Sequence, residues 1–227
     1  MAHSTSAYQA RIEKLFERAS AKKYPKNQLI YYEGDALTQT YLIKEGYVKA
    51  YTILDSGDMR TIFLLGPGDI FPIAFSTTMD WHNYKVKYFY QSLTDVGLKS
   101  LPMNTFKDLI EANTQNMSTY LAYMSASNAA IMKQLEVMKS KKAINKMIML
   151  LPYLVSKFGE RIRPNAYRLK IKLSHQEIAD LSGVTRETTT TLVKELEKRG
   201  VLEQIKGRLI IHTKRRKNNG RKSNKFN

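Results

Sequence analysis

The stretch LSHQEIADLSGVTRETTTTLVKELEKRGVLEQIKGRLIIH, residues 173–212, decides the architecture of the C-terminal third of the chain. Ser174 and Glu177 have the spacing of a capping box, in which each side chain bonds the backbone N–H of the other residue, so a helix begins here. Gly183 then permits a tight turn, and Thr185 is a favourable N-cap for a second helix over residues 186–199. The pattern predicts two short helices joined by a tight turn.

A β-hairpin follows this pair of helices. Gly200 ends the second helix, and two short runs, 201–205 and 208–211, flank the dipeptide Lys206-Gly207. Short apolar runs around such a turn are typical of a hairpin. Two helices and a hairpin in this order predict a winged helix-turn-helix.

Residues 141–173 lead into this unit. Residues 141–158 read as a helix rich in Met, Leu and Ile, and its interior Pro152 is expected to kink it. Gly159 is a natural C-cap position. Residues 167–173 alternate between apolar and basic side chains, which predicts a strand with one basic face.

A long helix is expected before them, with a strict heptad pattern. Spacings of 4, 3, 4, 3, 4 and 3 relate Met117, Leu121, Met124, Asn128, Ile131, Leu135 and Met138. Such a period predicts a seam between two helices, and a single Asn at an a position is a common register device in parallel dimers. The alternative is a helix that packs on its own domain.

The N-terminal half has a different period. Short apolar runs at 29–32, 41–43, 47–54 and 61–65 are separated by Gly/Asp turns, which predicts a compact antiparallel barrel or sandwich. Residues 8–20 suit a short amphipathic helix. Residues 104–111 read as another helix, with Asn104 as its N-cap.

Charge is concentrated at the C-terminal end. The net charge is +17, yet residues 1–140 hold 15 Lys/Arg and 13 Asp/Glu. Residues 141–212 hold 15 Lys/Arg and 7 Asp/Glu, and residues 213–227 hold 7 Lys/Arg and no Asp/Glu. Such an asymmetry usually serves binding to a polyanion. The last segment is rich in Gly and Asn, so a disordered basic tail is predicted.

Composition argues against several classes of protein. The chain has no cysteine and four histidines, none at helical ligand spacing from another, so neither a metal site nor any other cofactor is expected. No apolar run approaches the roughly 20 residues of a membrane helix, and residues 1–20 do not resemble a secretory signal. We find no Gly-rich phosphate loop, nucleophile elbow or His/carboxylate constellation, so we expect no enzyme. A cytoplasmic, nucleoid-associated location is expected.

Residues 173–212 resemble the winged helix of the Crp–Fnr family of bacterial transcriptional regulators, and residues 29–71 resemble that family's β-roll sensor. The resemblance spans nearly everything from Lys22 to His212. It implies an α+β chain with a cupin-like antiparallel β-roll, a long dimerisation helix and a winged helix-turn-helix. The expected domains are 1–112, 113–140 and 141–212, followed by the tail 213–227.

The resemblance also implies which residues meet DNA. Arg186 and Glu187 match the family's base-reading positions, with Thr191 where many members have Arg. An Arg can bind guanine in a bidentate way, and a Glu can accept from cytosine N4. Backbone contacts are expected from Ser174, Gln176, Thr188, Thr190 and Lys194. As an isolated pair, Arg186 and Glu187 would read as solvated charges in the first turn of a helix.

The predicted β-roll lacks the residues with which cyclic-AMP-binding relatives hold their ligand. Pro72-Ile73-Ala74 replaces their Gly-Glu-Leu, residues 84–87 hold no Arg-Ser, and apolar Ile131 and Met132 stand at the purine positions. Because phosphate and purine edges need polar partners, cyclic nucleotide is not expected.

An apolar effector pocket is one remaining prediction for the sensor. Its expected lining is Phe71, Ile73, Phe75, Tyr84, Lys85, Tyr88, Tyr120, Tyr123 and Met124. The alternative is that these aromatic residues fill the core of a constitutive protein. His82 reads as an exposed loop residue, not as a haem ligand.

The expected function is therefore a sequence-specific regulator that binds a near-palindromic operator as a homodimer. Its expected partners are double-stranded DNA, a second copy, RNA polymerase if it activates, and a small-molecule effector if one exists; no membrane is involved. The alternative is a non-specific nucleic-acid or nucleoid-binding protein.

Overall fold

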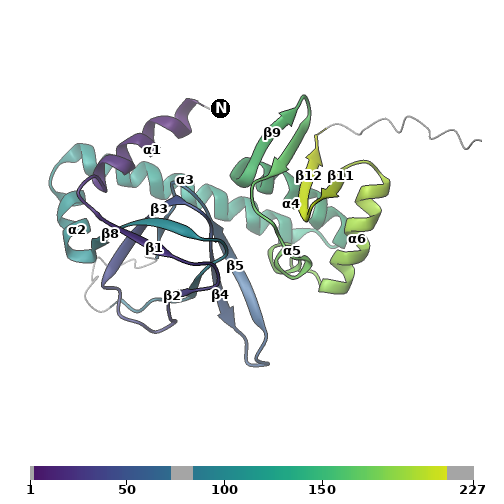
Figure 1. Cartoon of the computed structure of the whole chain (residues 1–227), viewed down its shortest axis with the longest axis horizontal. Coiled ribbons are helices and arrows are strands. Elements are labelled where there is room, and N and C mark those ends of the chain that lie inside the picture. The colour runs from purple at the N-terminus through teal and green to yellow at the C-terminus, as the bar shows by residue number, and fades with distance from the viewer. Residues whose placement is uncertain (1–2, 73–83, 214–227) are drawn as a thin grey trace, which may run out of the picture. The chain divides into compact units, whose positions relative to one another are not determined.

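The structure is a computed structural model that describes residues 3–72 and 84–213. Side chains of residues 3–8, 130, 133–135, 137 and 138 lie outside that description. The chain divides into two units, Met1–Lys133 and Gln134–Asn227. The predicted β-roll falls in the first unit and the predicted winged helix in the second (Figure 1).

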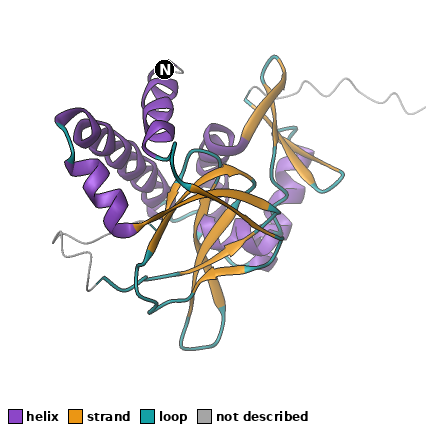
Figure 2. Cartoon of the chain, turned by 60° about the vertical axis from the view of Figure 1, so that its left-hand side comes forward, coloured by secondary structure: helices purple, strands orange, loops and turns teal. Residues whose placement is uncertain are grey.

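Two four-stranded antiparallel sheets form the β-roll (Figure 2). The first has the order β1-β8-β3-β6 and the second β2-β7-β4-β5. Their bounds are β1 Ser20–Tyr24, β2 Leu29–Tyr31, β3 Gln39–Glu45, β4 Val48–Ile53, β5 Met59–Leu65, β6 Ile70–Phe71, β7 Phe89–Ser92 and β8 Val96–Pro102. The runs predicted at 29–32, 41–43, 47–54 and 61–65 correspond to β2, β3, β4 and β5. Among the described strands of the roll, β1, β6, β7 and β8 were not individually predicted.

Three helices accompany the roll: α1 His3–Leu15, α2 Met103–Glu111 and the first part of α3 Thr114–Lys139. Ile12, Leu15 and Phe16 are buried, as the amphipathic pattern predicts. Asn104 is not the N-cap of α2, because the helix begins one residue earlier, after Pro102, without a side-chain cap bond. Met103 is buried and its backbone N–H donates to the Thr38 carbonyl, so packing and a bond from the roll fix this start.

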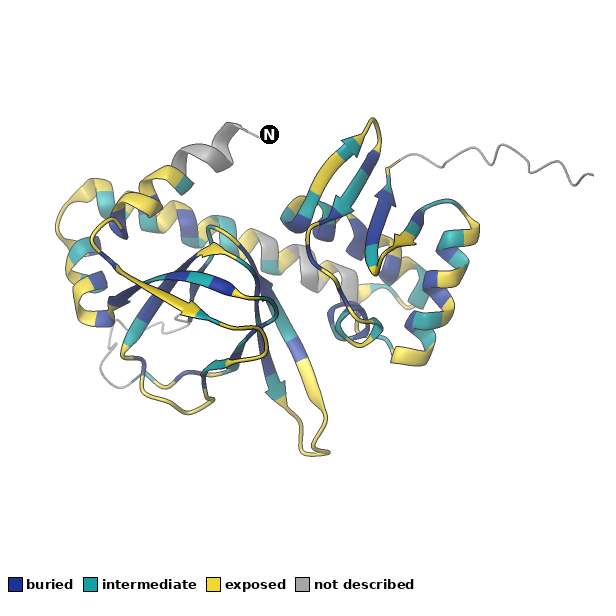
Figure 3. Cartoon of the chain, viewed as in Figure 1, coloured by how far each residue is buried: buried dark blue, intermediate teal, exposed yellow. Residues whose placement is uncertain are grey.

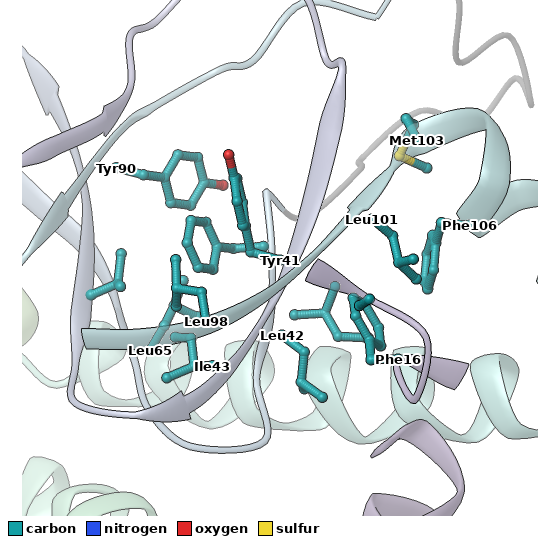
Figure 4. Close-up of a cluster of buried hydrophobic side chains, with 14 of the residues drawn as sticks. Phe16, Tyr41, Leu42, Ile43, Leu65, Tyr90, Leu98, Leu101, Met103 and Phe106 are labelled. Carbon is teal, nitrogen blue, oxygen red and sulfur yellow. The ribbon is translucent and has the colours of Figure 1, made fainter. Parts of the chain in front are cut away.

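Aromatic and aliphatic side chains from both sheets and all three helices share one core. Figure 4 shows part of it, with Phe16, Tyr41, Leu42, Ile43, Leu65, Tyr90, Leu98, Leu101, Met103 and Phe106 labelled. The Phe71 ring stacks between Tyr41 and Tyr90, at centroid distances of 5.2 and 5.3 Å. From α3, the Tyr123 hydroxyl accepts from Ile70 N at 2.7 Å and donates to Ile70 O at 3.3 Å. This pair of bonds fixes α3 against the end of β6.

The second unit contains α4 Ala143–Phe158, α5 His175–Ser182 and α6 Arg186–Lys198. Its sheet has the order β11-β12-β10-β9, with β9 Gly159–Arg163, β10 Ala166–Leu169, β11 Leu202–Ile205 and β12 Arg208–His212. Leu150, Leu154, Leu169, Leu181 and Leu196 are all fully buried here. The predicted winged helix-turn-helix is therefore confirmed in its element order.

The strand predicted over 167–173 is wrong in its second half. The ladder ends at Leu169, although Ile171 and Leu173 stay buried as the alternation predicts. Lys170 N donates to Phe158 O instead of to a neighbouring strand, so the chain leaves the sheet there. Gly159 does cap α4, in an extended conformation that begins β9. A Cβ at Gly159 would lie 2.4 Å from Val155 O, so the close approach requires glycine.

Candidate nucleic-acid interface

The capping box at the start of α5 is formed in full. The Ser174 hydroxyl accepts from Glu177 N at 3.2 Å, and Ser174 N donates to Glu177 Oε2 at 2.7 Å. The hydroxyl also donates to Glu177 Oε2, at 2.8 Å. Because a hydroxyl has one proton, Ser174 cannot donate to a phosphate while this bond holds. The predicted phosphate contact at Ser174 thus competes with the helix cap.

A left-handed residue joins α5 to α6. Gly183 has φ 64° and ψ 41°, a conformation that costs other residues energy, and Val184 N then donates to Ala179 O. The Lys146 ammonium on α4 donates to the Gly183 carbonyl at 3.2 Å, which ties α4 to the turn. Lys146 was not among the predicted site residues, because its position early in the helix before the motif is a weak signal in the sequence.

Helix α6 presents one buried face and one exposed face. Thr185 caps it, its side chain accepting from Thr188 N at 3.2 Å. Thr189, Leu192, Val193 and Leu196 are buried against the rest of the unit. Figure 3 shows how buried, intermediate and exposed stretches follow one another along α6. Arg186, Glu187, Thr191 and Lys194 are all exposed, and their spacing places them on one side of the helix. This brings the three predicted base-reading residues and one predicted phosphate contact together.

The threonine hydroxyls of α6 differ in what they still offer a partner. Thr190 Oγ1 donates to the Arg186 carbonyl at 3.0 Å and Thr191 Oγ1 to the Glu187 carbonyl at 3.2 Å, so both protons are committed. Thr188 Oγ1 accepts from Thr185 Oγ1 at 2.9 Å. Its own proton has no acceptor among the described residues, so it can be donated to a ligand. Thr188 is therefore the best phosphate donor of the three, whereas Thr191 offers a methyl group and an acceptor.

Side-chain contacts hold two further polar residues of α5, Gln176 and His175. Gln176 Nε2 donates to Asp180 Oδ1 at 2.8 Å, which orients the amide along the helix. His175 Nδ1 lies 2.9 Å from Thr190 Oγ1 and so joins α5 to α6. His175 was not among the predicted site residues, because no local pattern in the sequence shows that α6 brings Thr190 to it.

The wing is a short hairpin with basic surroundings. Lys206 and Gly207 have positive φ values of 50° and 76°, which form the tight turn between β11 and β12. On the neighbouring strands, Arg168 bonds Glu160 at 2.9 Å, and this bond and charge hold the pKa of the exposed Glu160 carboxyl below its usual value. Lys170 and Arg208 lower it further. The strands beside the wing therefore carry a surplus of positive charge.

In the β-roll, the residues predicted to line an effector pocket are divided among different environments. Phe71 and Tyr123 are buried in the core, and Tyr84, Tyr88, Tyr120 and Met124 pack on its edge. Burial raises the pKa of Tyr120 to about 12, so its hydroxyl stays neutral at physiological pH. Lys85 is exposed, and Ile73 and Phe75 lie outside the described residues. Phe71 is thus a core residue, which agrees with the alternative that these aromatic residues fill the interior.

The residues of the predicted dimer seam also lie in different environments. Met117 and Met124 pack against the roll, so at these two positions the helix packs on its own domain. Leu121 is 59% exposed, Asn128 is exposed and Ile131 is partly buried. Leu135 and Met138 have no described side chains. One exposed line along α3 runs through Leu121, Ser125, Asn128 and Met132, the last 61% exposed. This line keeps the heptad spacing but rotates it away from the roll.

In the described ranges 3–72 and 84–213, no cluster of three or more metal-ligating side chains occurs. No helix within these ranges has both the length and the apolar character to span a membrane.

Two domain families match the chain. Residues 145–217 match the Crp-like helix-turn-helix domain, and residues 21–113 match the cyclic nucleotide-binding domain. The two matches cover the winged helix and the β-roll described above.

Similar proteins match over most of their length. The global nitrogen regulator of Nostoc sp. is 24% identical over 191 residues, which is 83% of either chain. The fumarate and nitrate reduction regulatory protein of Salmonella typhimurium is 25% identical over 200 residues, covering 88% of this chain and 76% of that protein. Among solved structures, FixK2 from Bradyrhizobium japonicum has a TM-score of 0.72 at 18% identity, over 87% of this chain and 93% of that one. The structural likeness shows a shared fold.

Proposed function

We propose, from the premise that this chain belongs to the Crp–Fnr family of transcriptional regulators, that it binds a near-palindromic operator as a homodimer and reads bases with α6. The single observation that carries this proposal is the exposed face of α6. Arg186, Glu187 and Thr191 share that face, on a helix whose opposite side is buried and whose first turn is capped. A capped, well-packed helix can enter a major groove without losing its shape.

Arg186 and Glu187 have complementary roles in this proposal. The Arg186 guanidinium is suited to guanine O6 and N7, and the Glu187 carboxylate to cytosine N4. Neither side chain has a hydrogen-bond or ion-pair partner within the described residues. Both are therefore available to a base edge without breaking an existing contact.

The neighbouring residues are proposed to hold the phosphate backbone. Thr188 and Lys194 retain donors, and Gln176 has one amide N–H beyond its bond to Asp180. Ser174 and Thr190 have committed their protons, so we assign them to positioning the helices. Such contacts fix the register on DNA and carry no base preference.

Dimerisation is proposed along the exposed line of α3. Leu121 and Met132 are large apolar side chains more than half exposed, and a second copy packed along this line would bury both of them. Asn128 lies between them, where a polar residue specifies register. Two winged helices joined in this way would meet half-sites about one helical turn apart.

The sensor is proposed to bind no cyclic nucleotide, although its domain family is named for such ligands. Met132, one of two residues at the purine positions, is exposed and apolar, and Lys85 is exposed where an Arg-Ser pair would be. The packed interior around Phe71 supports a constitutive regulator or one controlled by a different small molecule. We also propose a non-enzymatic, cytoplasmic protein, with RNA polymerase as partner if it activates.

The test compares two DNA probes. Replacing Arg186 with Ala should weaken binding to an operator, selected from a random library by the wild-type protein, by about 1–3 kcal/mol. Binding to a random duplex of the same length should change little, because phosphate contacts remain. Lys194→Ala is the matched control and should weaken both probes alike. Equal losses for Arg186→Ala on both probes, or a wild-type preference below about tenfold, would favour the non-specific alternative.

A further inference from the structure

The basic segment at the C-terminal end, residues 214–227, has no role in the base reading proposed above. It carries seven Lys/Arg and no Asp/Glu, and it lies outside the described residues. The residues directly before it are fixed, because Thr213 N donates to the Asn165 carbonyl at 2.9 Å and His212 N to the Val201 carbonyl at 2.8 Å. The structure therefore defines where the basic segment leaves the folded unit.

This exit lies between the turn that joins β9 to β10 and the C-terminal end of α6. Asn165 belongs to that turn, and Val201 N donates to the Leu196 carbonyl in the last turn of α6 at 3.0 Å. Helix α6 has 13 residues, so it is about 20 Å long. Arg186 is its first residue, so the basic segment begins about one helix length from the proposed base-reading end.

Two exposed arginines of β9 lie beside the exit. Arg163 pairs with Ala166, and Ala166 pairs on its other side with His212, so these residues form one row across the sheet. The Arg163 side chain is 56% exposed, although its guanidinium lies 3.6 Å from a Glu203 carboxylate oxygen. Arg161, on the same edge strand, is exposed and has no ion-pair partner among the described residues. The positive charge of the basic segment thus continues onto the folded sheet.

A surface of this kind suits the phosphates of duplex DNA. DNA carries one negative charge per about 1.7 Å of its axis, and Lys and Arg bind phosphates without reading bases. The 14 residues of the basic segment span up to about 50 Å when extended, which exceeds the length of α6. Two segments of like charge, one from each protomer, repel each other at the centre of an operator, whereas the two outer flanks keep them apart.

We propose that Arg161, Arg163 and the basic segment form a second DNA-binding element, which holds the phosphates that flank each half-site on its outer side. The proposal rests on the operator binding proposed above and adds a contact without base preference. Its free energy comes from the release of counterions, so the contact is strong at low salt and weakens as salt is added. The element therefore lengthens the bound site and increases the salt dependence of binding.

The first measurement compares two duplexes that contain the same selected operator. One ends at the half-sites, and the other continues for about one helical turn on each side. Wild-type protein should bind the longer duplex more tightly. With about four extra phosphates held per dimer, the slope of log K against log salt should be steeper by about 3.6 for the longer duplex. Its advantage should then fall about a hundredfold between about 50 and about 200 mM salt.

Full-length variants assign this advantage to particular charges. Replacing the seven Lys/Arg of the basic segment with Gln should remove most of the advantage of the longer duplex, and Arg161→Gln with Arg163→Gln should remove part of it. The matched control for the arginine pair is Lys22→Gln with Lys23→Gln, two exposed lysines of β1, which should keep the advantage. A basic segment with the same residues in a different order should also keep it, because the contact depends on charge.

Hydroxyl-radical footprints on the longer duplex give a readout that does not depend on affinity. Wild-type protein should protect the sugar–phosphate backbone beyond both half-sites, and protein with the Gln-substituted segment should leave it open. Equal wild-type affinity for the two duplexes, or an unchanged advantage after removal of either set of charges, would overturn this inference. A wild-type protein that does not distinguish the operator from random DNA would instead refute the proposed function, while the salt slope of the Gln-substituted protein would still report on the phosphate contacts.

Discussion

The interior of the β-roll and the outer face of α6 both collect residues that the sequence marks as functional candidates, yet the structure uses them differently. In the roll, Phe71 is fully buried and stacked between Tyr41 and Tyr90. On α6, Arg186 and Glu187 are exposed and unpaired within the described residues. The difference teaches that side chains which satisfy one another stabilise a fold, and side chains left without protein partners remain available for a ligand.

The largest expected effect is therefore on stability, in the roll. Phe71→Ala should cost about 3–5 kcal/mol of unfolding free energy, because it removes a buried ring and leaves a cavity. Arg186→Ala should change it by less than about 0.5 kcal/mol. Denaturant unfolding of both variants measures this contrast. A small loss of unfolding free energy for Phe71→Ala would indicate that the ring borders an open pocket, and would support the effector site predicted there.

Helix α3 shows the same contrast along one element. Met124 packs on the roll, whereas Leu121, one turn away, is 59% exposed. If a second copy covers Leu121, Leu121→Glu should raise the dimer dissociation constant about a hundredfold, because two buried leucines are lost per dimer. Sedimentation over a range of protein concentrations measures it.

The matched control for this prediction is Ala122→Glu. Ala122 is also exposed, about 100° around the helix axis from Leu121, and its replacement should leave the dimer intact. An unchanged dimer in Leu121→Glu would move the interface elsewhere and exclude the exposed line of α3.

The smallest expected effect concerns the cap of α6. Thr185→Ala removes the acceptor for Thr188 N and the donor to Thr188 Oγ1, and should cost about 0.5–2 kcal/mol of stability. Thr185→Ser should restore it. Operator affinity at a temperature well below unfolding should fall only slightly. A large loss of affinity at unchanged stability would mean that Thr185 itself contacts DNA.

Local patterns in the sequence were sufficient to predict the helix-turn-helix. Capping boxes, turn glycines and apolar spacing act over three or four residues, so Ser174, Gly183 and Thr185 could be assigned before any tertiary contact was known. The strand runs of the roll followed from their period for the same reason. The exposed face of α6 was predictable too, because burial of Leu192, Val193 and Leu196 fixes the opposite side.

Only the tertiary structure decided the features that depend on distant segments. The rotation of α3 against the roll follows from Tyr123 bonding Ile70, 53 residues away, and it packs Met117 and Met124 against the roll core. The start of α2 depends on the Thr38 carbonyl, and the bridge from His175 to Thr190 depends on how two helices cross. A heptad pattern cannot show whether a helix packs on its own domain or on a second copy. Either surface would bury the same apolar side chains.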